Sequence, residues 1–275
     1  MDLMFSSWER KLLQLSFLIS IIFLVYFLYV SGYEYHSLGI YTQIPLTIIP
    51  VVGGLIGLER FKQWGMFKSM MGKALLFLSL GMIVWGVALG MWTYYYYVNI
   101  TLPYPSLADY VFIWSPPLWI IGLVFLSKVV GAPFAFKNPK ETLLGLGVGV
   151  LVAIVSYYIL VVIGHENVLS LPEDTFTQLF FNYAYTAEIL VVVVFVGTSY
   201  MFSKKYLGGK FKMSVLQLFL GFLIHFFAVF FFVYTITKGT YFNGNIADIL
   251  FTLAVYLESL GIINLDPKLA TNAKK

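Results

Sequence analysis

Cysteine is absent from this 275-residue chain, and charged residues are scarce. The lack of cysteine excludes disulfides, thiolate metal sites and thiol catalysis. Charged side chains make up 11% of the chain, whereas a typical soluble domain has about 25%. Hydrophobic residues contribute 60% and aromatic residues 19%, a balance that no water-soluble domain of this length could keep dispersed. The sequence therefore predicts an integral membrane protein.

Several functional signatures are also missing. Strands that alternate every second residue are absent, which argues against a membrane barrel. No Asp-rich diphosphate motif, His-x-x-x-His, His-Glu-x-x-His or nucleophile elbow is present, so an enzyme is the less favoured class. No lysine lies inside a predicted span to form a retinal Schiff base. We expect no cofactor and no resident metal.

The apolar residues are gathered in runs that match the ~20 residues an α-helix needs to cross a bilayer core. The predicted fold is all-α, a polytopic membrane bundle of eight transmembrane helices. The predicted spans are Leu12–Val30, Tyr41–Leu58, Ala74–Tyr96, Leu107–Leu126, Leu143–Ile163, Phe176–Phe202, Ser214–Ile236 and Ile246–Leu265.

The net charge of +4 reflects membrane orientation rather than a nucleic-acid surface. With the N-terminus in the cytoplasm, every lysine and arginine falls on the inner side except Lys238. An even number of spans then places the C-terminus in the cytoplasm as well. We expect a multi-pass protein of the cell membrane, with no nucleic-acid partner.

Two stretches of the chain share one pattern. Ser106–Gly122 and Asn245–Gly261 both read Ala-Asp-x-x-Phe, and each has a glycine thirteen residues after its aspartate. The first copy lies in the fourth predicted span and the second in the eighth, four spans later, so both copies run in the same direction. The sequence therefore predicts two parallel four-helix repeats, residues 1–135 and 136–275, related by an axis along the membrane normal.

Prolines predict irregular helices in the first repeat. The second span contains Pro45 and Pro50 together with three glycines, and we expect it to be kinked or locally unwound. Pro116 and Pro117 should bend the fourth span.

The repeated aspartates have two interpretations. Asp109 and Asp248 each follow a helix-capping residue by three positions (Ser106 and Asn245), which is the spacing of a capping box. The alternative is that they ring an acidic outer vestibule. Other predicted outer-loop residues would contribute imidazole and carboxylate groups, which also suit a divalent cation: Glu34, His36, His165 and Glu166.

Three ionisable residues are predicted near the bilayer centre. Glu188 lies ~18 Å down its helix, Glu258 ~16 Å below Asp248, and His225 ~20 Å from the inner face, at 1.5 Å per residue. One interpretation is that they only form hydrogen bonds between helices. The other is that they line a cavity for a proton, a cation or a small polar ligand.

Pro105–Phe112, with the tryptophans Trp85 and Trp92 in the preceding helix, resembles multi-helix membrane input modules that precede diguanylate cyclase or histidine kinase domains in microbial signalling proteins. The resemblance implies a membrane sensor. Only residues 266–275 follow the last predicted span, so the output would need a cytoplasmic or membrane signalling partner.

These observations favour a protein of sensor or receptor type that binds a small or lipid-like ligand, a proton or a cation within the bundle. The alternative is a small ion-coupled transporter. An accessory subunit of a membrane complex and an intramembrane lipid-modifying enzyme remain as third alternatives.

Overall fold

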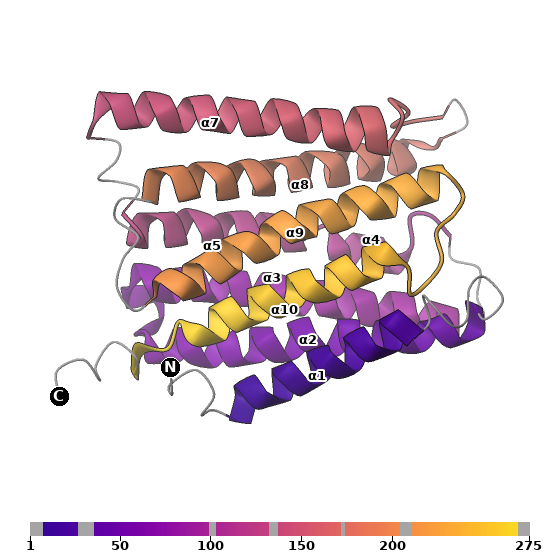
Figure 1. Ribbon diagram of the computed structural model, residues 1–275, viewed down its shortest axis with the longest axis horizontal. Coiled ribbons are helices and arrows are strands. Elements are labelled where there is room, and N and C mark those ends of the chain that lie inside the picture. The colour runs from indigo at the N-terminus through magenta and orange to yellow at the C-terminus, as the bar shows by residue number, and fades with distance from the viewer. Residues whose placement is uncertain are drawn as a thin grey trace.

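The computed structural model describes residues 8–26, 36–98, 103–131, 137–171, 174–203 and 211–268. Within these ranges the chain is helical and contains no strand, which confirms the predicted all-α class. The helices run side by side along the molecule (Figure 1). Their bounds are α1 Trp8–Tyr26, α2 His36–Gln63, η4 Met66–Lys68, α3 Met70–Tyr97, α4 Leu107–Phe112, α5 Ser115–Val129, α7 Pro139–Tyr157, η5 Tyr158–Gly164, α8 Phe176–Ser203, α9 Lys212–Thr237 and α10 Ile246–Asn264.

Seven helical segments of the described chain are long and apolar enough to cross a membrane. They coincide with the second to eighth predicted spans, and two of them are composite, because α4 with α5 and α7 with η5 each form one span. The first predicted span is represented by α1, and its last residues, 27–30, lie outside the described ranges. Large apolar side chains on α1 and α7 face outward, as expected for contact with lipid.

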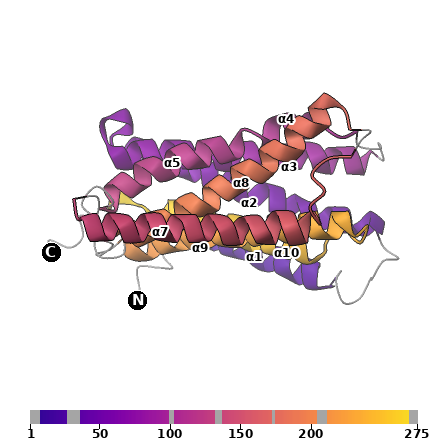
Figure 2. The ribbon, with the colours of Figure 1, turned by 90° about the horizontal axis from the view of Figure 1, so that it is seen from above.

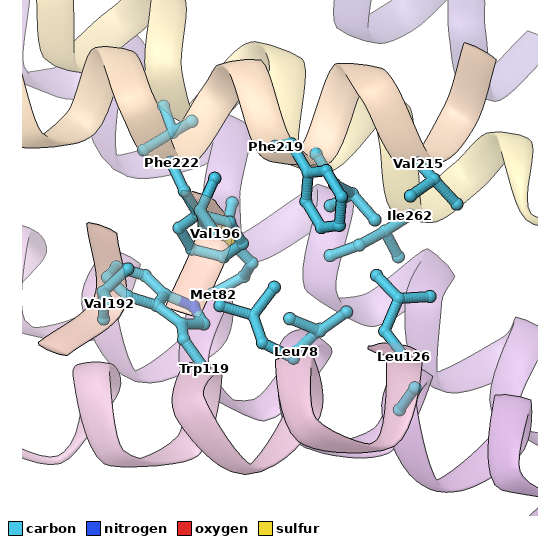
Figure 3. Packing of buried hydrophobic residues seen from close by; sticks show 14 of the residues in the cluster. Leu78, Met82, Trp119, Leu126, Val192, Val196, Val215, Phe219, Phe222 and Ile262 are labelled. Carbon is cyan, nitrogen blue, oxygen red and sulfur yellow. The ribbon is translucent and has the colours of Figure 1, made fainter. Parts of the chain in front are cut away.

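The helices pack as two groups. One group contains α3, which packs against α5, and the other contains α9, which packs against α10. Helix α2 contacts both groups, through α3 and α10. Figure 2 shows α3 and α5 on one side of the bundle and α9 and α10 on the other. Between them lies a buried apolar core in which Leu78 and Met82 of α3, Trp119 of α5 and Phe222 of α9 meet (Figure 3).

Glycines allow the close approach of α3 to α5 and of α9 to α10. A Cβ on Gly81 would lie 2.4 Å from Trp119 Cδ1, and a Cβ on Gly221 would lie 2.7 Å from Glu258 Cγ. The glycines that follow the repeated aspartates behave alike. A Cβ would lie 2.7 Å from Leu78 Cγ at Gly122 and 2.6 Å from Leu218 Cγ at Gly261.

The second span was predicted to be kinked or locally unwound, and local unwinding does not occur in the described part of α2. Helix α2 continues through both Pro45 and Pro50 to Gln63. Its glycines serve packing, since a Cβ on Gly53 would lie 2.1 Å from Ser259 Oγ. Contacts with α3 and α10 therefore hold a segment that local propensity alone would not.

The fourth span, for which the sequence predicted a bend, is interrupted between two helices. Helix α4 ends at Phe112, and α5 begins at Ser115, so that Pro116 and Pro117 occupy the first turn of α5. Proline is tolerated there because first-turn N–H groups have no intrahelical acceptor.

Candidate functional site

Both repeated aspartates lie at helix starts, at the end of the bundle where α4 and α10 begin, here called the aspartate end. Asp109 Oδ2 accepts hydrogen bonds from Ser106 N at 2.6 Å and from Ser106 Oγ at 2.7 Å, which confirms the predicted cap. In α10 the roles are divided. Asn245 Oδ1 accepts from Ala247 N at 2.8 Å, and Asp248 Oδ2 accepts from Gly244 N at 2.6 Å.

Each aspartate also receives a hydrogen bond from a helix of the other predicted repeat. Tyr185 of α8 donates through its hydroxyl to Asp109 Oδ1 at 3.1 Å, and Gln43 Nε2 of α2 donates to Asp248 Oδ2 at 2.8 Å. Tyr241, in the connection before α10, donates to Asp248 Oδ1 at 3.4 Å. Burial, with a smaller effect of Asp248, raises the pKa of Tyr241 well above its usual value, so this phenol remains a donor.

The two aspartates line one cavity of about 200 Å³ between the two groups of helices. Its walls come from α2, α3, α4, α5, α8, α9 and α10, and most of them are apolar or aromatic. The lining residues are Gln43, Leu46, Trp85, Leu89, Trp92, Asp109, Phe112, Pro116, Trp119, Tyr185, Ile189, His225, Val229, Phe232, Val233, Tyr241, Asp248 and Phe251. We call this space the inter-repeat cavity, because residues of both predicted repeats line it.

His225 lines the inter-repeat cavity and is fully buried, as is Glu258 next to it. His225 Nδ1 lies 3.1 Å from Glu258 Oε1. The rings of Trp85, Trp119 and Phe251 surround the imidazole edge to face, with centroids at 4.6, 5.0 and 5.3 Å. His225 Nε2 has no hydrogen-bond partner among the described residues.

The structure thus joins two of the three ionisable residues predicted near the bilayer centre. No hydrogen bond or ion pair in the described chain connects Glu188 with His225 or Glu258, and Glu188 does not line the cavity. One of its carboxylate oxygens, Oε2, is buried with no partner among the described residues.

The other predicted vestibule residues lie apart from the cavity. His165 follows η5, with its Nε2 3.4 Å from Thr186 Oγ1, and burial lowers the pKa of His165. Glu166 pairs with Lys238. Glu34 and the side chain of His36 fall outside the described residues. In the part of the chain that is described, no three His, Asp or Glu side chains group as a metal site.

Except for Trp85 and Trp119, which take the positions of His225 and Glu258 in the first predicted repeat, the aromatic walls of the cavity did not stand out in the sequence as a binding surface. A signal was present in α3, where Trp85, Leu89 and Trp92 recur at spacings of four and three residues, which place them on one helix face. Gln43 was a second signal, as a lone amide in an apolar span.

Comparisons of the chain with protein-family models, curated proteins and solved structures find no match. The geometry of the cavity is therefore the basis on which a function can be inferred. Apolar and aromatic walls with a few convergent polar groups are typical of small-molecule sites.

Proposed function

We propose that this protein is a non-enzymatic membrane receptor that binds a small ligand in the inter-repeat cavity and reports its occupancy to a signalling partner. One observation carries the proposal: aromatic walls and polar groups from both predicted repeats, including Asp109, Asp248 and His225, converge on a single cavity. A ligand that touches both groups of helices binds one relative arrangement better than another. Such differential binding is what shifts a conformational equilibrium.

The proposed architecture has eight spans, with α1 as the first, arranged as two parallel four-helix repeats. Equivalent contacts support it. Gly81 packs on Trp119 as Gly221 packs on Glu258, and Tyr185 reaches Asp109 much as Gln43 reaches Asp248. The distribution of lysine and arginine supports an orientation with both termini in the cytoplasm and the aspartate end outside.

Helices α2 and α10 offer a route from the cavity to the opposite end of the bundle. Near the cavity they are joined by Gln43 and Asp248. At the other end Arg60 Nη2 lies 3.3 Å from Asp266 Oδ2, and Trp64 Nε1 donates to the backbone oxygen of Leu265 at 2.7 Å. A change in how these helices meet at the cavity would therefore alter a polar junction on the proposed cytoplasmic side.

The test is a search for small ligands that includes compounds of every charge class. The purified protein in lipid nanodiscs is screened by thermal unfolding against neutral, anionic and cationic compounds. We expect at least one class to raise the unfolding temperature of the wild type but not of Val229→Trp, which fills the cavity. The matched control is Leu220→Trp, on the outward-facing side of the same helix, and it should respond like the wild type. Compounds that stabilise all three proteins equally would contradict the proposal.

Reporting of occupancy is tested separately. The chain lacks cysteine, so Lys62→Cys and Met213→Cys allow spin labels to be placed only at the proposed cytoplasmic ends of α2 and α9. We expect the distance distribution between the labels to change when a ligand found in the screen is added. An unchanged distribution with a saturating ligand would contradict the sensor role while leaving binding intact.

A small ion-coupled transporter is the second candidate, and the His225–Glu258 pair beside the cavity favours it. Ionisable groups within membrane spans commonly mark proton or ion pathways. Uptake of a bound compound into proteoliposomes, driven by a pH gradient and lost in Glu258→Gln, would establish this function in place of the receptor.

A further inference from the structure

We infer that the ligand of the inter-repeat cavity is a compact organic cation, an amine or a quaternary ammonium compound, bound near Asp109 and Asp248 and enclosed by aromatic rings. This inference rests on the proposed function, because it names the chemical class that the proposed receptor site would take.

The charges that line the cavity favour a cationic ligand. Asp109 and Asp248 both line the cavity, and their hydrogen-bond partners among the described residues are neutral groups of Ser106, Tyr185, Gln43, Gly244 and Tyr241. The lining contains neither lysine nor arginine. Asp248 is buried, and a carboxylate in low-dielectric surroundings is costly unless a positive charge compensates it. A cationic ligand supplies the charge that the walls lack.

The second argument is the chemistry of the walls. Eight of the eighteen lining residues are tryptophan, tyrosine or phenylalanine. The ring of Tyr241, whose hydroxyl donates to Asp248, lies edge to face with Phe232 at 5.0 Å and with Trp92 at 6.5 Å between centroids. The negative face of an aromatic ring attracts a cation, and aromatic cages with a nearby carboxylate suit ammonium groups.

The imidazole of His225 gives a third indication, which is independent of the carboxylates. His225 lines the cavity, and its buried Nε2 has no hydrogen-bond partner within the described chain. A hydroxyl or an N–H group on a ligand could form a hydrogen bond with Nε2, and a hydroxyl can do so with either tautomer because it both donates and accepts. The ligand is therefore expected to have a cationic end and a small polar end.

The size of the cavity limits the ligand. Its volume of about 200 Å³ falls below the ~300–1,000 Å³ typical of pockets for drug-sized molecules. A small ammonium compound fits this limit better than a lipid does.

Choline tests the inference because it has an uncharged isostere, 3,3-dimethyl-1-butanol, and an anionic relative, 3,3-dimethylbutanoate. Binding of each is measured by calorimetry on the full chain in nanodiscs, with tetramethylammonium and propylammonium as further cations. We expect choline to bind at least about tenfold more tightly than the isostere, the ratio expected for one charge-assisted contact. Tetramethylammonium, which lacks the hydroxyl, should bind more weakly than choline.

Variants locate the effect. Asp109→Asn and Asp248→Asn should each weaken choline binding about tenfold while leaving the isostere unchanged. Trp92→Leu should weaken choline more than the isostere, and it leaves both helix caps intact. Asp174→Asn is the matched control, because it removes the same charge from an aspartate that does not line the cavity and that accepts a hydrogen bond from Leu171 N. It should bind choline like the wild type.

The outcomes separate the two proposals. The inference is overturned if all three cations fail to bind, if the isostere or the anion binds as tightly as choline, or if neither aspartate variant weakens choline binding. If a neutral or anionic compound binds the wild type and is lost in Val229→Trp, the proposed function stands without the cation. If compounds of every class fail, both proposals fall.

Discussion

Replacing one member of the His225–Glu258 pair should destabilise the protein far more than replacing both. His225→Phe keeps a ring among Trp85, Trp119 and Phe251, but it leaves the Glu258 carboxyl group without its partner. Glu258→Met keeps an unbranched stem where Gly221 packs closely, but it leaves the imidazole unpaired. Both side chains are fully buried, so water cannot replace the lost contact.

The burial of the pair sets the magnitude. An orphaned buried neutral group costs about 1–3 kcal/mol, and a broken buried ion pair costs about 3–5 kcal/mol. We therefore expect each single substitution to cost about 3 kcal/mol, where the two ranges meet. The double variant should cost much less than the sum, because replacing both partners by apolar groups of similar shape is often close to neutral.

The assay is reversible unfolding in mixed micelles, followed by tryptophan fluorescence, for the wild type, both single variants and the double variant. Trp85 and Trp119 contact the imidazole and report on this region directly. Hydrogen bonds between membrane helices average about 0.6 kcal/mol in such cycles. A coupling energy of that size, with single costs below about 1 kcal/mol, would show that the pair is ordinary interhelical bonding.

Three further predictions concern packing and titration. Gly53→Ala places a Cβ 2.1 Å from Ser259 Oγ and should lower the free energy of unfolding by about 1–3 kcal/mol in the same assay. The control is Gly147→Ala, whose Cβ meets nothing within 4 Å. Equal effects of the two substitutions would contradict close packing at Gly53. Burial lowers the pKa of His165, so as the pH falls the imidazole is protonated in the unfolded chain before it is protonated in the folded protein, and stability should fall below about pH 6.5. The advantage of the wild type over His165→Gln in unfolding free energy, measured from pH 8 to 5, should therefore shrink as the pH falls. A difference that stays constant over this range would refute the prediction. The hydrogen bond with Glu166 raises the pKa of Lys238, so the pair is intact below about pH 10.4 and is lost as the pH rises through the raised pKa. Glu166→Gln should therefore lower the pKa of Lys238 in an NMR titration. An unchanged pKa would argue against this pairing in solution.

The fold class was predictable because a bilayer imposes a simple rule on sequence. Apolar runs of about 20 residues must become helices that satisfy their own backbone hydrogen bonds. An irregularity near Pro116 was predictable for a local reason, since the proline ring fixes the backbone and removes a donor. Local unwinding of α2 was predicted wrongly because Gly53 is a packing contact with Ser259, which local sequence does not reveal.

The site was only partly predictable. Helical rise places Glu188, His225 and Glu258 at similar depths, but depth does not fix the direction in which each helix faces. Only His225 and Glu258 meet. The spacing of the aspartates predicted their capping role, while their convergence on one cavity depends on the relative rotation of seven helices that no single segment encodes.

The most direct test of the account is an experimental density map of the protein in nanodiscs, determined with the compound that stabilises it most. The account predicts ligand density inside the inter-repeat cavity, in contact with Asp109, Asp248 and His225. Density found only on the lipid-facing groove that Tyr157 and Val191 line between α7 and α8, or a sealed core in which the two aspartates do not share a cavity, would contradict it.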